Sequence, residues 1–336
     1  MILDINLLPK KFNEVNYFKK LESGCEIYSY SKTLNERNEV LIVKLDDFEI
    51  ANDFCVENKT LEMVKVLYPC DIEITEKSFI IKSKKGKYTG KLLSEDLFSL
   101  QIEDLFSTAI EADINVLIKA STYVNKNIQK PVLTGVRVDL NSNVYATDSF
   151  RAYFYVPNNK ALTTEGITLP ISFINNIKSI FNLENNNVKI NIYKNIVYYE
   201  NENITLCSKI IEGAYPDMSK IFGNYKAHET IDVDKTDLLD KISIANNVGT
   251  DNDKNTIVVL SKNKFEAFGS NNYEAEIKFE NDNQFTFKLP INHLEQALKT
   301  IAESDAHFNI LHKDKIGIML FASNNEKEVC LILGIK

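Results

Sequence analysis

The sequence predicts an α+β protein made of three copies of one unit, and two observations predict it. First, two strand-to-helix turns share the triplet Leu-Pro-Ile, at 169–171 and 289–291, and lie 120 residues apart. Second, an alternating hairpin follows a helix three times, with first strands starting at Ile72, Lys189 and Phe308, which are 117 and 119 residues apart. Because order, spacing and turn all recur, we interpret the chain as a repeat.

Each copy is expected to contribute two amphipathic helices and several antiparallel strands. Helical spacing of apolar residues covers 10–21, 59–68, 114–126, 170–181, 235–248 and 290–301. Period-two alternation on both sides of a short turn predicts hairpins over 71–83, 188–200 and 307–321. Pro170 and Pro290 are expected at the first helical position, where a missing N–H costs nothing. The predicted domains are 1–105, 106–225 and 226–336, and an acidic connector over 92–107 ends the first.

The composition is ordinary for a soluble globular protein, with 44% hydrophobic and 26% charged residues among 336. No apolar run approaches a membrane span, and the N-terminus lacks the pattern of a signal peptide, so we expect a cytoplasmic protein. The five cysteines have no metal-ligand spacing and are expected to be reduced and buried. The four histidines show no such spacing either, so neither a metal nor a cofactor is expected.

Charge is segregated along the chain. The six expected helices sum to +7, whereas the whole chain has a net charge of -8, so the remaining residues carry -15. Basic helices in an acidic chain suit a polyanion such as duplex DNA that contacts the helices only. The candidate DNA-facing residues are Lys10, Lys11, Lys19, Lys20, Lys59, Lys65, Lys119, Lys126 and Lys178. The basic run at 82–88 is interpreted as a solvated hairpin end.

Four polar residues interrupt the strand-like segment NVYATDSFRAYFYV at 143–156, namely Thr147, Asp148, Ser149 and Arg151. This segment and its surroundings, KPVLTGVRVDLNSNVYATDSFRAYFYVP at 130–157, resemble the second domain of bacterial DNA polymerase III beta sliding clamps. SKIIEGAYPDMSKIF at 208–222 and the final CLILGIK resemble two further blocks of that family. The resemblance is clear over 105–336, and the repeat extends the assignment to 1–105.

The resemblance implies three clamp domains per chain, and two chains that close head to tail into a ring with helices lining the hole. Such a ring encircles duplex DNA without sequence preference and tethers the replicative DNA polymerase, so it is a processivity factor in DNA replication and not an enzyme. It also implies that the polymerase and the clamp loader insert short hydrophobic peptides, typically a Gln followed by Leu and a Leu/Phe pair, into one pocket.

That pocket is carried over position by position. The residues that the resemblance assigns to it are Thr147, Ser149, Phe150, Arg151, Ala152, Pro216, Lys220, Ile221, Pro290, His293, Leu331 and Leu333. We assign Asp148 to the turn, which its carboxylate caps, and for Arg151 a structural ion pair is the alternative. Phe150 replaces the histidine that is usual in the family, and Lys220 replaces a common arginine, which is not equivalent in bidentate contacts.

The dimer seam is expected to place Tyr88 against Ile244 and Ala245 of the other subunit. Two other classes of function stay open at this point. One is a monomeric clamp-like module that binds peptides without encircling DNA. The other is a nuclease or hydrolase on an α+β scaffold, which the lack of convergent carboxylates disfavours.

Overall fold

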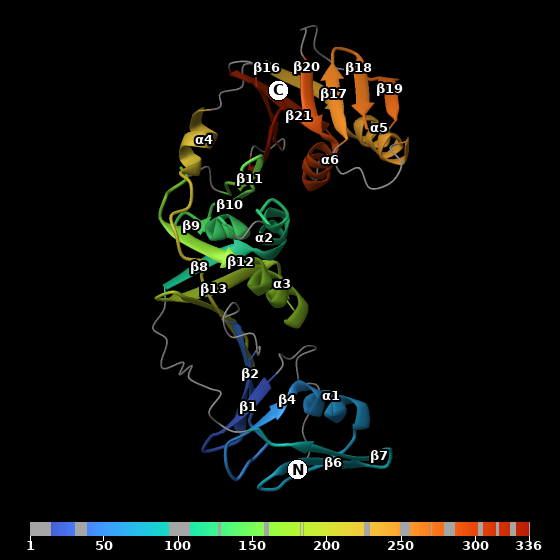
Figure 1. Ribbon diagram of the computed structural model, residues 1–336. Helices are drawn as coiled ribbons and strands as arrows, with labels where there is room; N and C mark the ends of the chain where they lie inside the picture. Colours follow the sequence, from blue (N-terminus) through green and yellow to red (C-terminus); the bar gives the residue numbers. More distant parts are fainter. Residues whose placement is uncertain are drawn as a thin grey trace. The chain divides into compact units, whose positions relative to one another are not determined.

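The computed structural model describes the chain except for residues 1–14, 31–38, 94–107, 127–128, 158–160, 182, 184, 225–228, 249–255, 270, 279–285, 302–304, 314–315, 323–326 and 336. The chain divides into two compact units (Figure 1). Unit 1 comprises Met1–Ile114 and Leu169–Ile210, and unit 2 comprises Asn115–Thr168 and Ile211–Lys336. No described helix is long and apolar enough to cross a membrane.

Unit 1 contains an eight-stranded antiparallel sheet in the order β4-β1-β2-β3-β15-β14-β13-β8. Its strands are β1 (Val15–Lys20), β2 (Cys25–Tyr30), β3 (Glu39–Leu45), β4 (Phe54–Glu57), β8 (Thr108–Asp113), β13 (Asn187–Tyr193), β14 (Ile196–Glu200) and β15 (Ile204–Lys209). A second sheet has three strands, β5 (Asp71–Ile74), β6 (Ser78–Ser83) and β7 (Gly86–Lys91). Helix α1 (Asn58–Leu67) packs on β4, β6 and β7, and helix α3 (Ile171–Ile180) packs on β15.

Unit 2 repeats this plan with an eight-stranded sheet in the order β12-β9-β10-β11-β23-β22-β21-β16. These strands are β9 (Gly135–Asp139), β10 (Val144–Thr147), β11 (Arg151–Tyr155), β12 (Gly166–Pro170), β16 (Glu229–Asp234), β21 (Asp305–Lys313), β22 (Ile316–Ala322) and β23 (Glu328–Leu333). A four-stranded sheet contains β17 (Ile257–Ser261), β18 (Lys264–Phe268), β19 (Asn272–Glu276) and β20 (Thr286–Pro290). The helices are α2 (Ile114–Ser121), α4 (Met218–Asn224), α5 (Lys235–Val248) and α6 (Ile291–Thr300).

The repeat is confirmed by the order of the elements. The middle copy runs strand, helix α2, four strands, helix α3 and three strands, and the last copy runs strand, α5, four strands, α6 and three strands. The described part of the first copy has the last eight of these elements, from β1 to β7. The predicted hairpin turn at Lys194 and Asn195 is also present, between β13 and β14.

The Leu-Pro-Ile turns end a strand and begin a helix, as predicted, but the proline lies one position earlier than expected. Pro170 and Pro290 are the last residues of β12 and β20 and cap α3 and α6, with ψ of 143° and 128°. A ψ in this range is extended, so each proline still belongs to the strand while its fixed φ points the chain into the helix.

Neighbouring copies share sheets, and this decides where the compact units divide. β3 of the first copy pairs with β15 of the middle copy, and β11 of the middle copy pairs with β23 of the last. The middle copy is therefore split between the two units. The predicted domain boundaries near 105 and 225 fall outside the described residues and stay a prediction.

The predicted helix at 10–21 is wrong over its described part, because Val15–Lys20 forms strand β1 between β2 and β4. Asn16 and Phe18 are fully buried on one side of this strand, and Tyr17 packs with the ring of Tyr28 on the other. The segment has helix-forming lysines, but pairing on both edges outweighs so weak a local preference. Residues 10–14 lie outside the described part of the chain.

Each unit has its own aromatic core. In unit 1, Phe18 stacks on Phe54 at a ring separation of 4.5 Å, and Phe79 lies 5.9 Å from Phe54. In unit 2, the largest fully buried side chains include Tyr123 and Tyr153. All five cysteines are free and buried, as predicted. Burial raises the pKa of Cys330 to about 12, which makes this thiol a poor nucleophile.

Candidate functional site

The polar residues at 147–151 form the turn of a hairpin, which answers why they interrupt a strand-like segment. β10 and β11 pair antiparallel, and Thr147 opposite Ala152 is the last pair before the turn. The Asp148 carboxylate accepts hydrogen bonds from the backbone N–H groups of Phe150 and Arg151, at 2.9 and 3.0 Å. Asp148 therefore caps the turn, as predicted from the sequence.

The tip of the turn has a left-handed residue. Ser149 has φ of 81°, and its backbone N–H donates to Thr147 Oγ1 at 3.1 Å. The same threonine hydroxyl donates to the Arg151 carbonyl at 2.7 Å. Thr147 thus satisfies backbone groups on both sides of the turn and stabilises a conformation that residues with a side chain rarely adopt.

The Arg151 side chain is held by other groups of unit 2. Its Nε donates to Asp148 Oδ2 at 2.8 Å, and both side chains are mostly buried, at 13% and 15% exposed. Its other two nitrogens donate to the Gln296 side chain and to the Thr122 carbonyl. The guanidinium also lies 5.1 Å from the centre of the Tyr123 ring. The structural ion pair considered for this arginine is therefore present.

A cavity of about 280 Å³ opens beside this turn. Its walls come from the hairpin, from the segment that enters α4 and from β23. The lining residues are Leu133, Thr147, Ser149, Phe150, Arg151, Ala152, Pro216, Met218, Ile221, Leu331 and Leu333. Most of these side chains are apolar, and the volume suits one or two inserted side chains better than a whole small molecule.

Three predicted pocket residues do not line this cavity. Lys220 is 78% exposed and lies 3.2 Å from Asp217 within α4 and its start. Pro290 and His293 belong to the β20–α6 turn. His293 Nδ1 is buried and has no hydrogen-bond partner among the described residues, and burial, aided by the charge of Arg151, lowers the pKa of this imidazole.

Two lining residues were not predicted. Met218 is 2% exposed and begins α4, a helix that sequence periodicity did not reveal because it spans only 7 residues. Leu133 lies in the 3-10 turn Pro131–Thr134 before β9. Each is an apolar residue inside a resemblance block, and that is the signal that pointed to them.

The predicted DNA-facing lysines lie on different kinds of element. Lys59 and Lys65 are on α1 and Lys178 is on α3, whereas Lys126 follows α2. Lys19 and Lys20 are on strand β1 instead of a helix, and Lys10 and Lys11 lie outside the described residues. With these bounds, α1 to α4 each have a net charge of +1 and α5 and α6 have none, so the helices are less basic than the sequence suggested.

Lys119 on α2 has an anionic partner. Its Nζ lies 2.8 Å from Glu328 Oε1 on β23, and the same oxygen accepts a hydrogen bond from the Tyr153 hydroxyl at 2.7 Å. Glu328 is 9% exposed, so this bridge ties the middle and last copies together inside unit 2. Part of the Lys119 charge is therefore neutralised before any DNA approaches.

Each unit also has a smaller sheet with an edge strand that pairs with no described strand on its outer side. In unit 1 this strand is β7, where Lys87 and Lys91 are exposed. In unit 2 it is β19, where Glu274 and Glu276 are exposed. Unpaired edges invite another strand, and these two edges have opposite charge.

The predicted seam residues lie on or near these edges. Tyr88 is on β7 and half-buried. Ile244 and Ala245 are on α5, a helix that packs on β19. Ile244 is 45% exposed and available to a partner, whereas Ala245 is 1% exposed and already packed inside unit 2.

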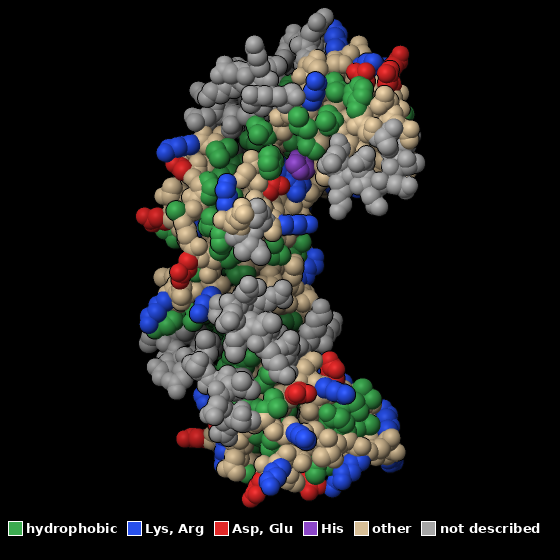
Figure 2. Space-filling model, viewed as in Figure 1, with side chains coloured by type: hydrophobic (Ala, Val, Ile, Leu, Met, Phe, Trp, Pro, Cys, Tyr) green, Lys and Arg blue, Asp and Glu red, His purple; other side chains and the backbone are tan. Residues whose placement is uncertain are grey.

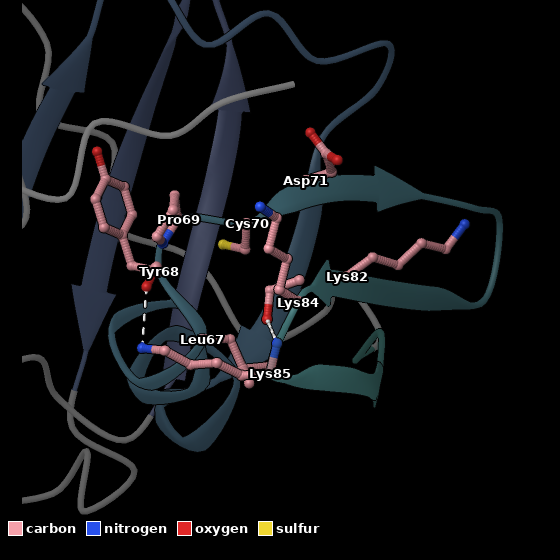
Figure 3. A pocket seen from close by; sticks show the side chains of 9 residues that line it. Leu67, Tyr68, Pro69, Cys70, Asp71, Lys82, Lys84 and Lys85 are labelled. Carbon is pink, nitrogen blue, oxygen red and sulfur yellow. Dashed lines mark hydrogen bonds between the residues drawn. The ribbon is translucent and has the colours of Figure 1, made fainter.

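A second, wider cavity lies beside β7 in unit 1, between the end of α1 and the β6–β7 turn (Figure 3). Lys85 donates to the Val66 and Tyr68 carbonyls at 3.2 and 3.1 Å, so it satisfies orphan carbonyls at the end of α1. Lys82 is paired with Glu73 at 2.5 Å. Figure 2 shows Lys and Arg side chains gathered on this end of unit 1.

No group of three or more His, Cys, Asp or Glu side chains that could hold a metal ion is found among the described residues. The site therefore consists of an apolar cavity with a rigid polar rim, charged helices and two open sheet edges. Such surfaces bind other macromolecules.

Comparisons with known proteins identify relatives with this organisation. Residues 111–217 match the family described as DNA polymerase III beta subunit, central domain. The chain is 27% identical over 183 residues to the beta sliding clamp of Lactococcus lactis, a match that covers 51% of this chain and 48% of that protein. It is 24% identical over 312 residues to the beta sliding clamp of Mycoplasma capricolum, covering 86% and 81%.

Solved structures share the fold. The putative DNA polymerase III beta subunit of Eubacterium rectale superposes with a TM-score of 0.79 at 17% identity, covering 96% of this chain and 91% of that one. The sliding clamp of Bacillus subtilis gives a TM-score of 0.76 at 17% identity, covering 99% and 93%. The central-domain match, the curated relatives and the shared fold together place this chain among the DNA polymerase III beta sliding clamps.

Proposed function

We propose that the protein is a DNA sliding clamp, a non-catalytic processivity factor that encircles duplex DNA and tethers a DNA polymerase in the cytoplasm. The observation that carries this proposal is the pair of open sheet edges at the two ends of the repeat. Each copy joins the next through a strand pair, β3 with β15 and β11 with β23.

By the same rule, β19 of the last copy has the position of β3 and β11, and β7 of the first copy has the position of β15 and β23. One chain cannot satisfy both edges with described strands, but a second copy can, in a head-to-tail dimer. The acidic edge of β19 and the basic edge of β7 are complementary across such a seam. Tyr88 and Ile244 would then lie near the seam, as the resemblance implies.

The proposed grip on DNA is topological. Lysines on α1 and α3, with Lys126, supply a modest positive charge that suits weak and sequence-independent contact with phosphates. Weak contact favours sliding, because a ring stays on its track without a tight bond. No cofactor is needed for this function.

The cavity beside the hairpin turn is the proposed site for short hydrophobic peptides of the polymerase and the clamp loader. Its apolar walls and small volume support anchoring by one or two side chains. Partner choice then depends on the residues at its mouth.

Retention on DNA tests the ring. The protein is loaded on nicked circular DNA by a clamp loader, and the DNA is then linearised. We expect the protein to stay on the circle and to leave the linear form through its ends. Equal retention on both forms would contradict encirclement.

Sedimentation at micromolar concentration tests the dimer. We expect twice the mass of the 38.4 kDa chain. Glu274→Lys, which places like charges across the proposed seam, should shift the protein to monomer, and Glu274→Lys combined with Lys87→Glu should restore part of the dimer. A wild-type mass of one chain would favour the peptide-binding module that does not encircle DNA.

A further inference from the structure

The largest exposed aromatic side chain of unit 2 stands at the mouth of the peptide cavity. Phe150 is 63% exposed and lines the opening. An exposed phenyl ring normally costs solvation free energy, and exposed apolar groups at a concave apolar surface mark interaction sites. Because the ring is not needed to fill the cavity, its position calls for an account in terms of a partner.

The backbone that holds this ring is fixed before any partner binds. The Phe150 N–H is bound by the Asp148 carboxylate at 2.9 Å, and its carbonyl accepts a hydrogen bond from the Leu333 N–H at 2.8 Å. The flanking N–H groups of Ser149 and Arg151 are also bound, at 3.1 and 3.0 Å. A partner that contacts the ring therefore orders little more than the two side-chain torsions of a phenylalanine.

Charges near the mouth are already paired. The Arg151 guanidinium is bound by Asp148, Gln296 and Thr122, as described above. Lys220 pairs with Asp217 on the α4 side. An acidic or basic side chain of a partner would have to compete with these contacts, whereas an uncharged one would not.

The cavity next to the ring also favours an aromatic occupant. Its buried wall includes Met218, and a thioether makes favourable contacts with aromatic rings. Tyr145 and Tyr215, which pack against the same cluster, lie edge to face at 5.6 Å, so the surroundings are rich in rings.

We infer that Phe150 is a specificity-determining residue of this pocket, whose ring packs against an aromatic side chain next to an uncharged stretch of the partner peptide. This inference rests on the proposed peptide-binding role of the cavity. An aromatic pair contributes beyond the area it buries, so we expect an aromatic peptide to bind about 3- to 10-fold more tightly than an aliphatic one.

Fluorescence anisotropy with two labelled peptides, Gln-Leu-Ser-Leu-Phe and Gln-Leu-Ser-Leu-Leu, tests the inference on the full-length protein. The wild type should prefer the first peptide. Phe150→Leu keeps an apolar side chain but removes the ring, and it should bring the ratio of the two Kd values close to one. Thermal unfolding should be unchanged, because the Phe150 side chain is mostly in solvent.

Leu140→Ala is the matched control, because Leu140 is 60% exposed and does not line the cavity. It should leave both Kd values unchanged. Ile221→Glu places a charge in the cavity wall and should abolish binding of both peptides.

The outcomes separate the two levels of the argument. If both peptides bind, Ile221→Glu abolishes binding and Phe150→Leu leaves the ratio unchanged, the role of Phe150 is overturned while the pocket stands. If the wild type binds neither peptide at millimolar concentration, the pocket and the inference both fall.

Discussion

The two eight-stranded sheets have the same topology, but different side chains occupy the places where neighbouring copies join. In unit 2, the last pair before the β10–β11 turn is Thr147 with Ala152, and Leu331 of β23 lies opposite Ala152. In unit 1, the pair at the same place in the β2–β3 hairpin is Tyr30 with Val40. Small side chains leave room for a cavity in unit 2, whereas larger ones pack together in unit 1.

The unit 1 join contains a cluster of tyrosines. Tyr28, Tyr30 and Tyr198 pack with Val40 and Cys207, and all five are buried. The rings of Tyr28 and Tyr30 are stacked at 6.5 Å. The corresponding face of unit 2 has the peptide cavity. The fold is thus compatible with either a filled or an open join, and side-chain size decides between them.

The opposite face of each join differs in polarity. In unit 1, Leu41 pairs with Leu206, both buried. In unit 2, the equivalent pair is Tyr153 with Cys330, whose neighbours include the Lys119–Glu328 bridge. Apolar packing therefore holds one join, and a polar network contributes to the other.

The residue that begins the third strand of each hairpin differs in charge. Glu39 accepts hydrogen bonds from Ser172 and Asn176 on α3. At the equivalent position in unit 2, Arg151 donates to Gln296 on α6, which lies 120 residues after Asn176. Both contacts tie a hairpin to a helix of the next copy, although the charge is reversed.

The largest effect is expected from emptying the filled join. Tyr30→Ala should destabilise unit 1 by about 3 kcal/mol, because it removes a buried aromatic side chain from a packed cluster. Urea unfolding followed by circular dichroism measures the loss. Thr147→Ala at the equivalent position is the matched variant and should cost only about 1 kcal/mol. Equal costs at the two positions would contradict the comparison.

Asp148→Ala should cost about 2 kcal/mol, since it leaves two turn N–H groups and the Arg151 guanidinium without their acceptor. Peptide affinity should fall with it, because the same turn positions Phe150. Glu39→Ala, at the equivalent strand start in unit 1, should destabilise the protein without changing peptide affinity. Unchanged affinity of the Asp148 variant would show that the cap does not support the pocket.

Glu328→Gln tests the polar network and should cost about 1 kcal/mol, because the amide keeps one acceptor for Tyr153 but loses the charge that Lys119 faces. Asp46→Asn is the control, since the Lys44–Asp46 pair is 50% and 61% exposed. Such a surface pair should contribute less than about 0.5 kcal/mol. A larger loss for the control would mean that burial does not distinguish the two pairs.

The smallest effect is a pH dependence confined to unit 2. The lowered pKa of His293 favours its neutral form in the folded state. Its contribution is therefore present above the ordinary imidazole pKa of about 6.5 and is lost as pH falls below that value. Arg151 opposes protonation and Asp148 favours it, and these are the charged groups that act on the imidazole.

His293→Phe copies the residue at the equivalent position of α3, the fully buried Phe173. Comparing unfolding at pH 7.5 and 5.5 should show a smaller loss at low pH in this variant than in the wild type. An identical loss in both proteins would assign the pH dependence to other groups.

The sequence by itself determined the repeat, five of its helices and the hairpins, because these depend on local periodicity and on proline-marked turns. It also determined the cap at Asp148, since an aspartate in a turn bonds its own neighbours. The resemblance supplied most of the cavity wall, although not Met218, which lies in a helix too short to show a period.

Only the tertiary structure decided the rest. Val15–Lys20 became a strand because β2 and β4 flank it, although its local preference suits a helix. Lys119 lost part of its charge to Glu328, which lies 209 residues away in the sequence. Whether a join is open or filled depends on side chains brought together from distant copies, and local sequence patterns carry no information about such contacts.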